Sequence, residues 1–118
     1  MAIETVKGFR DILPPESLKR QAIREVIEKN FKLFGFVPIE TPTIEYEELV
    51  RGDNQNDSAV SDRFRLKDRG ERELALRFEF TFQLKRIFKE NPNIKLPFRR
   101  YQVGYVFRDE PVERNRYR

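Results

Sequence analysis

The chain has 118 residues, a length that suits one modest domain with a single core. Hydrophobic residues make up 38% of it and charged residues 37%, and the net charge of +4 permits an anionic partner without requiring one. Cysteine and histidine are both absent, which excludes a disulfide framework, thiol chemistry and an imidazole base within these residues. No apolar run could span a membrane and the N-terminus lacks a signal region, so we expect a soluble, cytoplasmic protein.

Residues 16–34 carry the clearest helical pattern. Proline occupies positions 14 and 15, where it suits the entry into a first helical turn. Gly35 follows, at the position where a left-handed residue commonly ends a helix. The apolar residues between them recur at steps of three and four and predict one apolar stripe: Leu18, Ala22, Ile23, Val26, Ile27, Phe31 and Phe34.

The next segments are short and rich in proline and polar residues. Residues 36–39 predict a strand, which Pro38 restricts to a sheet edge or an irregular pairing. Residues 43–49 fit either an extended segment or the start of a helix. Residues 51–62 have turn-forming residues throughout and predict a polar loop.

A hairpin and a second helix are expected in the following part. Residues 63–67 and 73–78 predict its two strands around the turn at 68–70. Residues 81–90 then predict a short helix, with Thr81 as a plausible N-cap.

Residues 101–108 alternate between two faces and predict a strand, which Pro111 ends. Helices mixed with hairpin-linked strands predict an α+β fold, in which helices flank an antiparallel sheet. Several aromatic residues are expected in its core: Phe31, Phe34, Phe36, Tyr101 and Phe107.

Four stretches, taken together and in this order, resemble histidyl-tRNA synthetase, a class II aminoacyl-tRNA synthetase. They are KGFRDILP at 7–14, FGFVPIETPTIEY at 34–46, LALRFEFT at 74–81 and VGYVFRDE…RNRYR at 103–118. The second resembles the first class II motif, and the fourth resembles the second class II motif. The resemblance covers nearly the whole chain.

The resemblance implies a single domain over 1–118, the N-terminal fragment of a class II catalytic core. The first motif then lies at about 16–46, and the second motif, at about 98–118, is truncated. Departures from the family pattern are Asn115, where glycine is common, and the bulky Phe78 and Phe80. Asparagine tolerates a left-handed turn, so Asn115 need not disrupt that loop.

The implied activity is that of a histidine–tRNA ligase, which uses ATP and Mg²⁺ to form histidyl-adenylate and then charges tRNA(His). The resemblance also implies a homodimer. A chain that ends inside the second motif is expected to be inactive alone.

By the same resemblance, Arg108 is the catalytic arginine that binds the α-phosphate of ATP and the carboxylate of histidine. Glu110 would meet the adenine amino group, and Arg116 would lie near the β- and γ-phosphates. The alternative interpretations are that Arg108 is a surface charge, Glu110 an ion-pair partner and Arg116 part of a frayed end, and the motif favours the binding roles.

For the amino acid, the resemblance points to Glu79 and Thr81, which would hold the ammonium group of histidine. Arg77 is expected to support these residues without touching the substrate. No metal ligands are identified.

Two other functions remain open. The regulatory subunit of ATP phosphoribosyltransferase is a non-catalytic protein with a similar sequence pattern, although the intact arginine set favours the ligase. A basic nucleic-acid-binding module would use exposed aromatics for base stacking, whereas the aromatics here are better explained as core.

Overall fold

The computed structural model describes residues 2–52, 60, 62–114 and 116–118. They fall into two compact units. Unit 1 comprises Met1–Ile39, Arg99–Tyr101 and Val112–Arg118, and unit 2 comprises Glu40–Phe98 and Gln102–Pro111. Within these described ranges, no helix is both long enough and apolar enough to cross a membrane.

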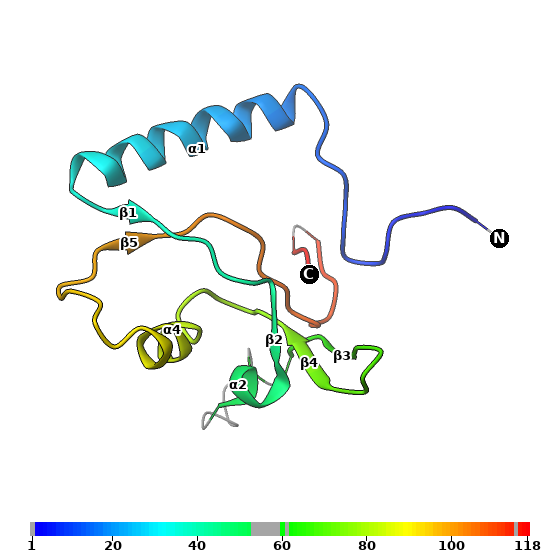
Figure 1. The fold of residues 1–118 in the computed structure, drawn as a ribbon. Helices are drawn as coiled ribbons and strands as arrows, with labels where there is room; N and C mark the ends of the chain where they lie inside the picture. The colour runs from blue at the N-terminus through cyan, green and yellow to red at the C-terminus, as the bar shows by residue number, and fades with distance from the viewer. Residues whose placement is uncertain (1, 53–59, 61, 115) are drawn as a thin grey trace. The chain divides into compact units, whose positions relative to one another are not determined.

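Unit 1 contains the long helix α1, Glu16–Leu33, where the sequence predicts it (Figure 1). Its C-terminus forms a Schellman motif, in which the Gly35 N–H donates to the Lys32 carbonyl (3.1 Å) and the Phe36 N–H to the Phe31 carbonyl (3.0 Å). Gly35 has the predicted left-handed backbone, with φ of 82°. The rings of Phe31 and Phe36 lie 5.9 Å apart, which adds the hydrophobic contact typical of this motif.

The apolar stripe of α1 is present but uncovered. None of the eighteen described residues of the helix is buried, and Leu18 is 61% exposed. Phe31 stacks on Tyr101 with 5.1 Å between ring centroids. Tyr101 is also the only buried hydrophobic residue among those described in unit 1, so the prediction of an aromatic core is wrong for the exposed Phe31 and Phe34.

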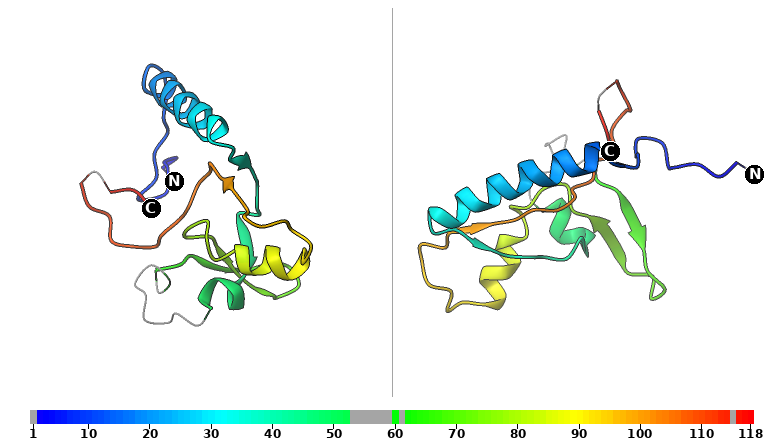
Figure 2. Two further views of the ribbon diagram at one scale, coloured as in Figure 1. Left: turned by 90° about the vertical axis from the view of Figure 1, so that its left-hand side faces the viewer. Right: turned by 90° about the horizontal axis from the view of Figure 1, so that it is seen from above.

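Two short strands of unit 1, β1 (Val37–Pro38) and β5 (Arg100–Tyr101), pair in parallel and lie side by side in Figures 1 and 2. The Val37 N–H donates to the Arg99 carbonyl (2.9 Å), and the Ile39 N–H donates to the Tyr101 carbonyl (3.1 Å). Pro38 lies between these two donors, so its missing N–H interrupts no hydrogen bond of the pair. The restriction of this strand to an edge is confirmed.

The predicted strand at 101–108 is confirmed only at its first residue. Residues 102–111 belong to unit 2, where their amides bond to neighbours outside any regular ladder. The Phe107 N–H donates to the Arg77 carbonyl (2.9 Å), and the Asp109 N–H donates to the Asp62 carbonyl (2.5 Å). A side-chain pattern that alternates between two faces favours a strand, but a strand also needs a continuous neighbouring strand for its backbone hydrogen bonds.

The sheet of unit 2 is antiparallel, with β4 (Glu73–Leu76) between β2 (Ile44–Tyr46) and β3 (Arg65–Lys67). Ala75 lies opposite Glu45 on one side and opposite Arg65 on the other. The predicted hairpin and the α+β class with an antiparallel sheet are therefore confirmed.

The core of unit 2 forms between the strand β4 and the helix that follows β2. The helix α2, Glu47–Arg51, follows β2 directly, so residues 43–49 contain both structures that the sequence left open. Phe82 packs against the core, its ring stacked on that of Phe78 at 5.4 Å. The buried members of this core are Val50, Val60, Ala75 and Phe78. Most of the predicted loop at 51–62 lies outside the described residues.

Helix α4, Leu84–Glu90, begins three residues later than predicted. Gln83 is its N-cap residue and provides no side-chain hydrogen bond to the helix. The N-cap prediction for Thr81 is therefore wrong, because Thr81 precedes the first helical turn by too far to cap it.

Candidate functional site

Most of the predicted site residues lie on two backbone segments of unit 2 that are joined by hydrogen bonds. The segment 105–108 lies beside the segment 77–78, which continues directly from β4. The Phe107 N–H donates to the Arg77 carbonyl (2.9 Å), and Arg77 Nε donates back to the Tyr105 carbonyl (2.7 Å). This pairing brings the segment that carries Arg108 next to the segment that carries Glu79.

Arg108 is exposed, and its guanidinium is largely uncommitted. Its Nε lies 3.5 Å from the Phe78 carbonyl, at the outer limit of a hydrogen bond. In the part of the chain that the structure describes, no carboxylate pairs with Arg108. An unpaired guanidinium presents a planar fork of donors that can bind a phosphate or a carboxylate.

Glu79 is half-buried and uses one carboxylate oxygen locally. Its Oε1 accepts a hydrogen bond from the Phe82 N–H (2.9 Å), which fixes the turn before α4. Among the described residues, the other oxygen has no hydrogen-bond donor and can still accept one. Thr81 is exposed, and its carbonyl accepts a hydrogen bond from the Leu84 N–H (3.0 Å). Its hydroxyl makes no hydrogen bond to another described residue and can accept one from a ligand.

Arg77 is the most deeply buried of the predicted site residues, with 7% of its surface exposed. Its Nη1 donates to the Thr41 carbonyl (3.0 Å), in addition to the bond from Nε to Tyr105. The guanidinium carbon lies 4.8 Å from the centre of the Phe80 ring, within the range of a cation–π contact. Burial lowers the pKa of the Arg77 guanidinium, and no described carboxylate offsets that effect.

The two remaining predicted residues are in different units. Glu110 is half-buried in unit 2, two residues beyond Arg108. Arg116 is exposed in unit 1, where its N–H donates to the Glu113 carbonyl (3.0 Å) and its Nη1 lies 3.8 Å from a Glu113 carboxylate oxygen. Unit 2 therefore holds five of the six predicted residues. The predicted turn residue Asn115 lies outside the described residues.

A buried polar network behind these residues was missed by the sequence analysis. Gln83 is fully buried, and its Oε1 accepts a hydrogen bond from the Thr41 hydroxyl (2.8 Å). Gln102 Nε2 donates to the same hydroxyl (2.8 Å), and Gln83 Nε2 donates to the Pro42 carbonyl (2.7 Å). Thr41, Gln83 and Gln102 lie far apart in sequence, so no local pattern could connect them.

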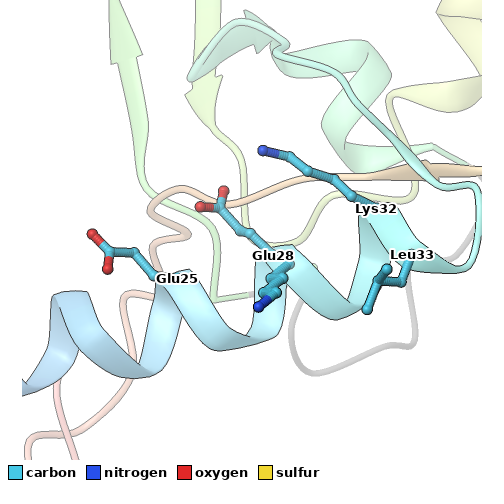
Figure 3. A pocket seen from close by; sticks show the side chains of 5 residues that line it. Glu25, Glu28, Lys32 and Leu33 are labelled. Carbon is cyan, nitrogen blue, oxygen red and sulfur yellow. The ribbon is translucent and has the colours of Figure 1, made fainter.

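A shallow pocket lies elsewhere, on the surface of α1 in unit 1 (Figure 3). The side chains that line it all come from this one helix: Glu25, Glu28, Lys29, Lys32 and Leu33. Two glutamates are followed along the helix by two lysines, each four residues from one of the glutamates, as on an ordinary solvated face. This pocket contains none of the predicted site residues.

Comparison with known proteins gives a consistent result. Residues 8–118 match the family described as histidyl-tRNA synthetase. The histidine–tRNA ligase 1 of Bacillus anthracis is 40% identical over 119 aligned residues, which cover 100% of this chain and 28% of that protein. The histidine–tRNA ligase of Helicobacter hepaticus is 42% identical over 97% of this chain and 26% of that protein.

Solved structures agree with these relatives. The histidyl-tRNA synthetase from Nostoc sp. PCC 7120 has a TM-score of 0.79 and 31% identity over 92% of this chain and 26% of that one. A Bacillus halodurans protein described as an ATP phosphoribosyltransferase regulatory subunit/histidyl-tRNA synthetase has a TM-score of 0.78 and 28% identity, over 89% of this chain and 27% of that one. The chain thus spans little more than a quarter of these relatives, and the predicted class II fold is confirmed over that part.

Proposed function

Because the chain belongs to the histidyl-tRNA synthetase family, we propose that it forms the N-terminal part of the catalytic core of a histidine–tRNA ligase. The whole enzyme would activate histidine with ATP and transfer it to tRNA(His). The observation that supports this best is the exposed Arg108, held beside the Glu79 segment without a carboxylate partner among the described residues.

The proposed reaction has two steps. An oxygen of the histidine carboxylate attacks the α-phosphorus of ATP, a new P–O bond forms, and the bond to pyrophosphate breaks. In the second step, a ribose hydroxyl oxygen of the tRNA forms an ester bond with the acyl carbon, the bond from that carbon to the phosphate oxygen breaks, and AMP leaves together with the hydroxyl proton. The attacking carboxylate of the substrate is already ionised and needs no general base. The reaction therefore does not require a histidine side chain from the protein, which has none in these 118 residues. The protein must instead hold two anions together and offset their charge.

Arg108 suits this task because its guanidinium can contact both anions. A planar fork of donors can bridge the α-phosphate and the attacking carboxylate and so stabilise the charge that develops between them. Its neighbour Glu110 would accept a hydrogen bond from the adenine amino group, and Arg116 would contact the β- and γ-phosphates.

Glu79 and Thr81 would hold the ammonium group of histidine. The Glu79 oxygen that is not used by Phe82 can accept from an ammonium, and the exposed Thr81 hydroxyl can add a second acceptor. Mg²⁺ would enter with the phosphates of ATP, since the described residues contain no group of three or more metal-ligating side chains.

We further propose that the whole enzyme is a cytoplasmic homodimer. The uncovered apolar stripe on α1 supports this proposal, because contiguous exposed apolar surface commonly marks an interface. Light scattering at tens of micromolar tests whether this chain already associates, and a strictly monomeric chain would contradict the idea that this surface alone suffices.

A chimera provides the test of the proposed activity. This chain replaces the matching N-terminal part of the Bacillus anthracis ligase, to which it is 40% identical, and histidine-dependent ATP–pyrophosphate exchange is measured. We expect the chimera to be active, and Arg108→Ala to lower its exchange rate about 10²–10³-fold, as loss of one charge-stabilising contact typically does.

Arg99→Ala is the matched control, because Arg99 is an exposed arginine in unit 1 to which the resemblance assigns no ligand. Equal, small effects of the two substitutions would show that Arg108 is only a surface charge. The isolated 118-residue chain should show negligible exchange, since positioning of both substrates requires the remainder of the site.

The alternative function is that of a regulatory subunit of ATP phosphoribosyltransferase. The similarity to the Bacillus halodurans structure supports this alternative. A folded chimera without exchange activity, in which Arg108→Ala changes nothing, would favour this regulator over the ligase.

A further inference from the structure

We propose that Arg77 is a positioning residue whose guanidinium ties the backbone at Tyr105 to the backbone at Thr41, and so fixes the segment that carries Arg108. The role assigned to Arg108 rests on the proposed function. The clamp itself rests only on contacts within unit 2.

Arg77 contacts the 105–107 segment in both directions. Its side chain donates from Nε to the Tyr105 carbonyl (2.7 Å), and its own carbonyl accepts from the Phe107 N–H (2.9 Å). Two hydrogen bonds two residues apart fix both the register and the orientation of this backbone. Arg108 follows immediately, so the path of its side chain depends on that register.

The other end of the clamp is at Thr41. Arg77 Nη1 donates to the Thr41 carbonyl (3.0 Å), while the Thr41 hydroxyl donates to Gln83 and accepts from Gln102, both at 2.8 Å. A hydroxyl has one proton to donate, and here Gln83 Oε1 receives it. Thr41 is therefore itself held in place, and it gives the guanidinium a fixed anchor.

These contacts favour positioning over direct substrate binding. Arg77 is buried, and its Nε and Nη1 already donate to main-chain carbonyls. Arg108 is exposed, and only its Nε makes a long contact, 3.5 Å from the Phe78 carbonyl. A guanidinium reaches two separate acceptors with a rigid fork, but the single ammonium of lysine cannot hold two carbonyls on different segments in the same way.

Gly104 gives the clamp the space it needs. A Cβ atom at position 104 would lie 2.7 Å from Arg77 Nη2 and 3.6 Å from Cζ of the Phe80 ring. Any larger residue would therefore displace the guanidinium from its place between the ring and the backbone.

Hydrogen exchange of single amides, measured by NMR on the 118-residue chain without nucleotide, tests the clamp. In Arg77→Met, we expect the Phe107 amide to exchange about tenfold faster, because the segment loses its tie to Thr41. The Leu76 amide, which bonds to the Phe64 carbonyl (3.0 Å) within the hairpin, should keep its rate. Arg77→Lys should restore little of the protection.

The control is Arg72→Met, which removes the same charge from an exposed position on the hairpin and should leave the Phe107 amide unchanged. An unchanged Phe107 rate in Arg77→Met, a uniform acceleration of all unit 2 amides, or full protection in Arg77→Lys would each overturn the proposal. If Arg77→Met fails to fold, Gly104→Ala decides, because it crowds the guanidinium and keeps its charge. We expect faster Phe107 exchange there too, and an unchanged rate would overturn the clamp.

A second readout links the clamp to Arg108. In the chimera, Arg77→Met should lower the rate of ATP–pyrophosphate exchange. The same substitution should lower that rate little further once Arg108→Ala is present, because Arg77 acts through Arg108. Fully additive losses would show that Arg77 acts independently of Arg108. An inactive chimera would count against the ligase proposal but not against the clamp, because the amide measurement involves no substrate.

Discussion

The two units differ in how much of their apolar surface they bury. Unit 1 contains the most regular apolar pattern of the chain, yet no residue of α1 is buried. Unit 2 has only short helices and strands, yet it buries Val50, Ala75 and Phe78. A periodic pattern therefore shows which face of a helix is apolar, whereas burial depends on a second surface that covers it.

Among the described residues, the ion pairs with a buried carboxylate lie in unit 2, which also has exposed pairs such as Arg72–Asp68. In unit 2, Glu47 is 6% exposed and pairs with Arg63. In unit 1, Arg10 and Glu16 form a two-pronged pair through 2.8 and 2.9 Å hydrogen bonds, but both side chains remain open to water. The two pairs should therefore contribute differently to the free energy of unfolding, because water screens the Arg10–Glu16 pair but not the Glu47–Arg63 pair.

The largest contrast is expected from apolar truncations. Phe78→Ala removes a buried ring stacked on Phe82 and should lower the free energy of unfolding by about 3–5 kcal/mol. Leu18→Ala on the exposed stripe of α1 should change it by less than about 0.5 kcal/mol. Urea unfolding followed by NMR signals from both units measures each effect, and similar midpoints for the two variants would contradict the contrast.

The charged pairs should give the next largest difference. Glu47→Gln leaves the Arg63 guanidinium, whose side chain is 12% exposed, without its carboxylate, and should cost about 3 kcal/mol of unfolding free energy. Glu16→Gln removes an equivalent charge in unit 1 and should have a much smaller effect, because Arg10 stays solvated. The same urea experiment compares them, and a larger loss in Glu16→Gln would reverse the interpretation.

A backbone test concerns two glycines of unit 1. Gly8 has φ of 90°, its carbonyl accepts from the Arg118 N–H (2.8 Å), and an added Cβ would lie 2.6 Å from Arg118 Cγ. Gly8→Ala should cost about 1–2 kcal/mol locally and speed exchange of the Arg118 amide. Gly35 has a similar φ of 82°, but no atom lies within 4 Å of an added Cβ. Gly35→Ala should therefore lower stability only through the strained backbone, without a steric clash. Unchanged exchange at Arg118 in Gly8→Ala would show that this contact is not maintained in solution.

The smallest effects should come from acid titration of exposed carboxylates. The hydrogen bond from Arg10 lowers the pKa of Glu16, and the Arg72 backbone N–H lowers the pKa of Asp68. A folded-state pKa below the unfolded value adds stability at higher pH, and that stability is lost as the pH falls through the folded pKa. Each contribution should be present at about pH 6 and fade below about pH 4.

Unfolding measured at both pH values tests this. Glu16→Gln should remove part of the acid sensitivity of unit 1, and Asp68→Asn part of that of unit 2. High salt should reduce both effects, because the groups are exposed. An acid sensitivity that is unchanged in both variants would mean that other groups control it.

Most of the candidate site residues could be proposed from sequence, because they lie in short continuous motifs, and their roles stay predictions. Glu79 and Thr81 share one segment, Arg108 and Glu110 share another, and the family resemblance identifies both. The polar network of Thr41, Gln83 and Gln102 could not be predicted, because hydrogen bonds between positions 42 and 61 residues apart leave no local periodicity. The same holds for the clamp of Arg77 on Tyr105, which joins positions 28 residues apart.

The sequence by itself determined the features that depend on neighbouring residues. These are the extent of α1, its termination at Gly35, the hairpin of β3 and β4, and the edge position of Pro38. Tertiary structure decided what depends on distant partners. It ended the strand predicted at 101–108 after Tyr101, because the backbone beyond bonds to Arg77 and Asp62 outside any ladder. It also buried Arg77, because only the folded chain brings the carbonyls of Thr41 and Tyr105 within reach of one guanidinium.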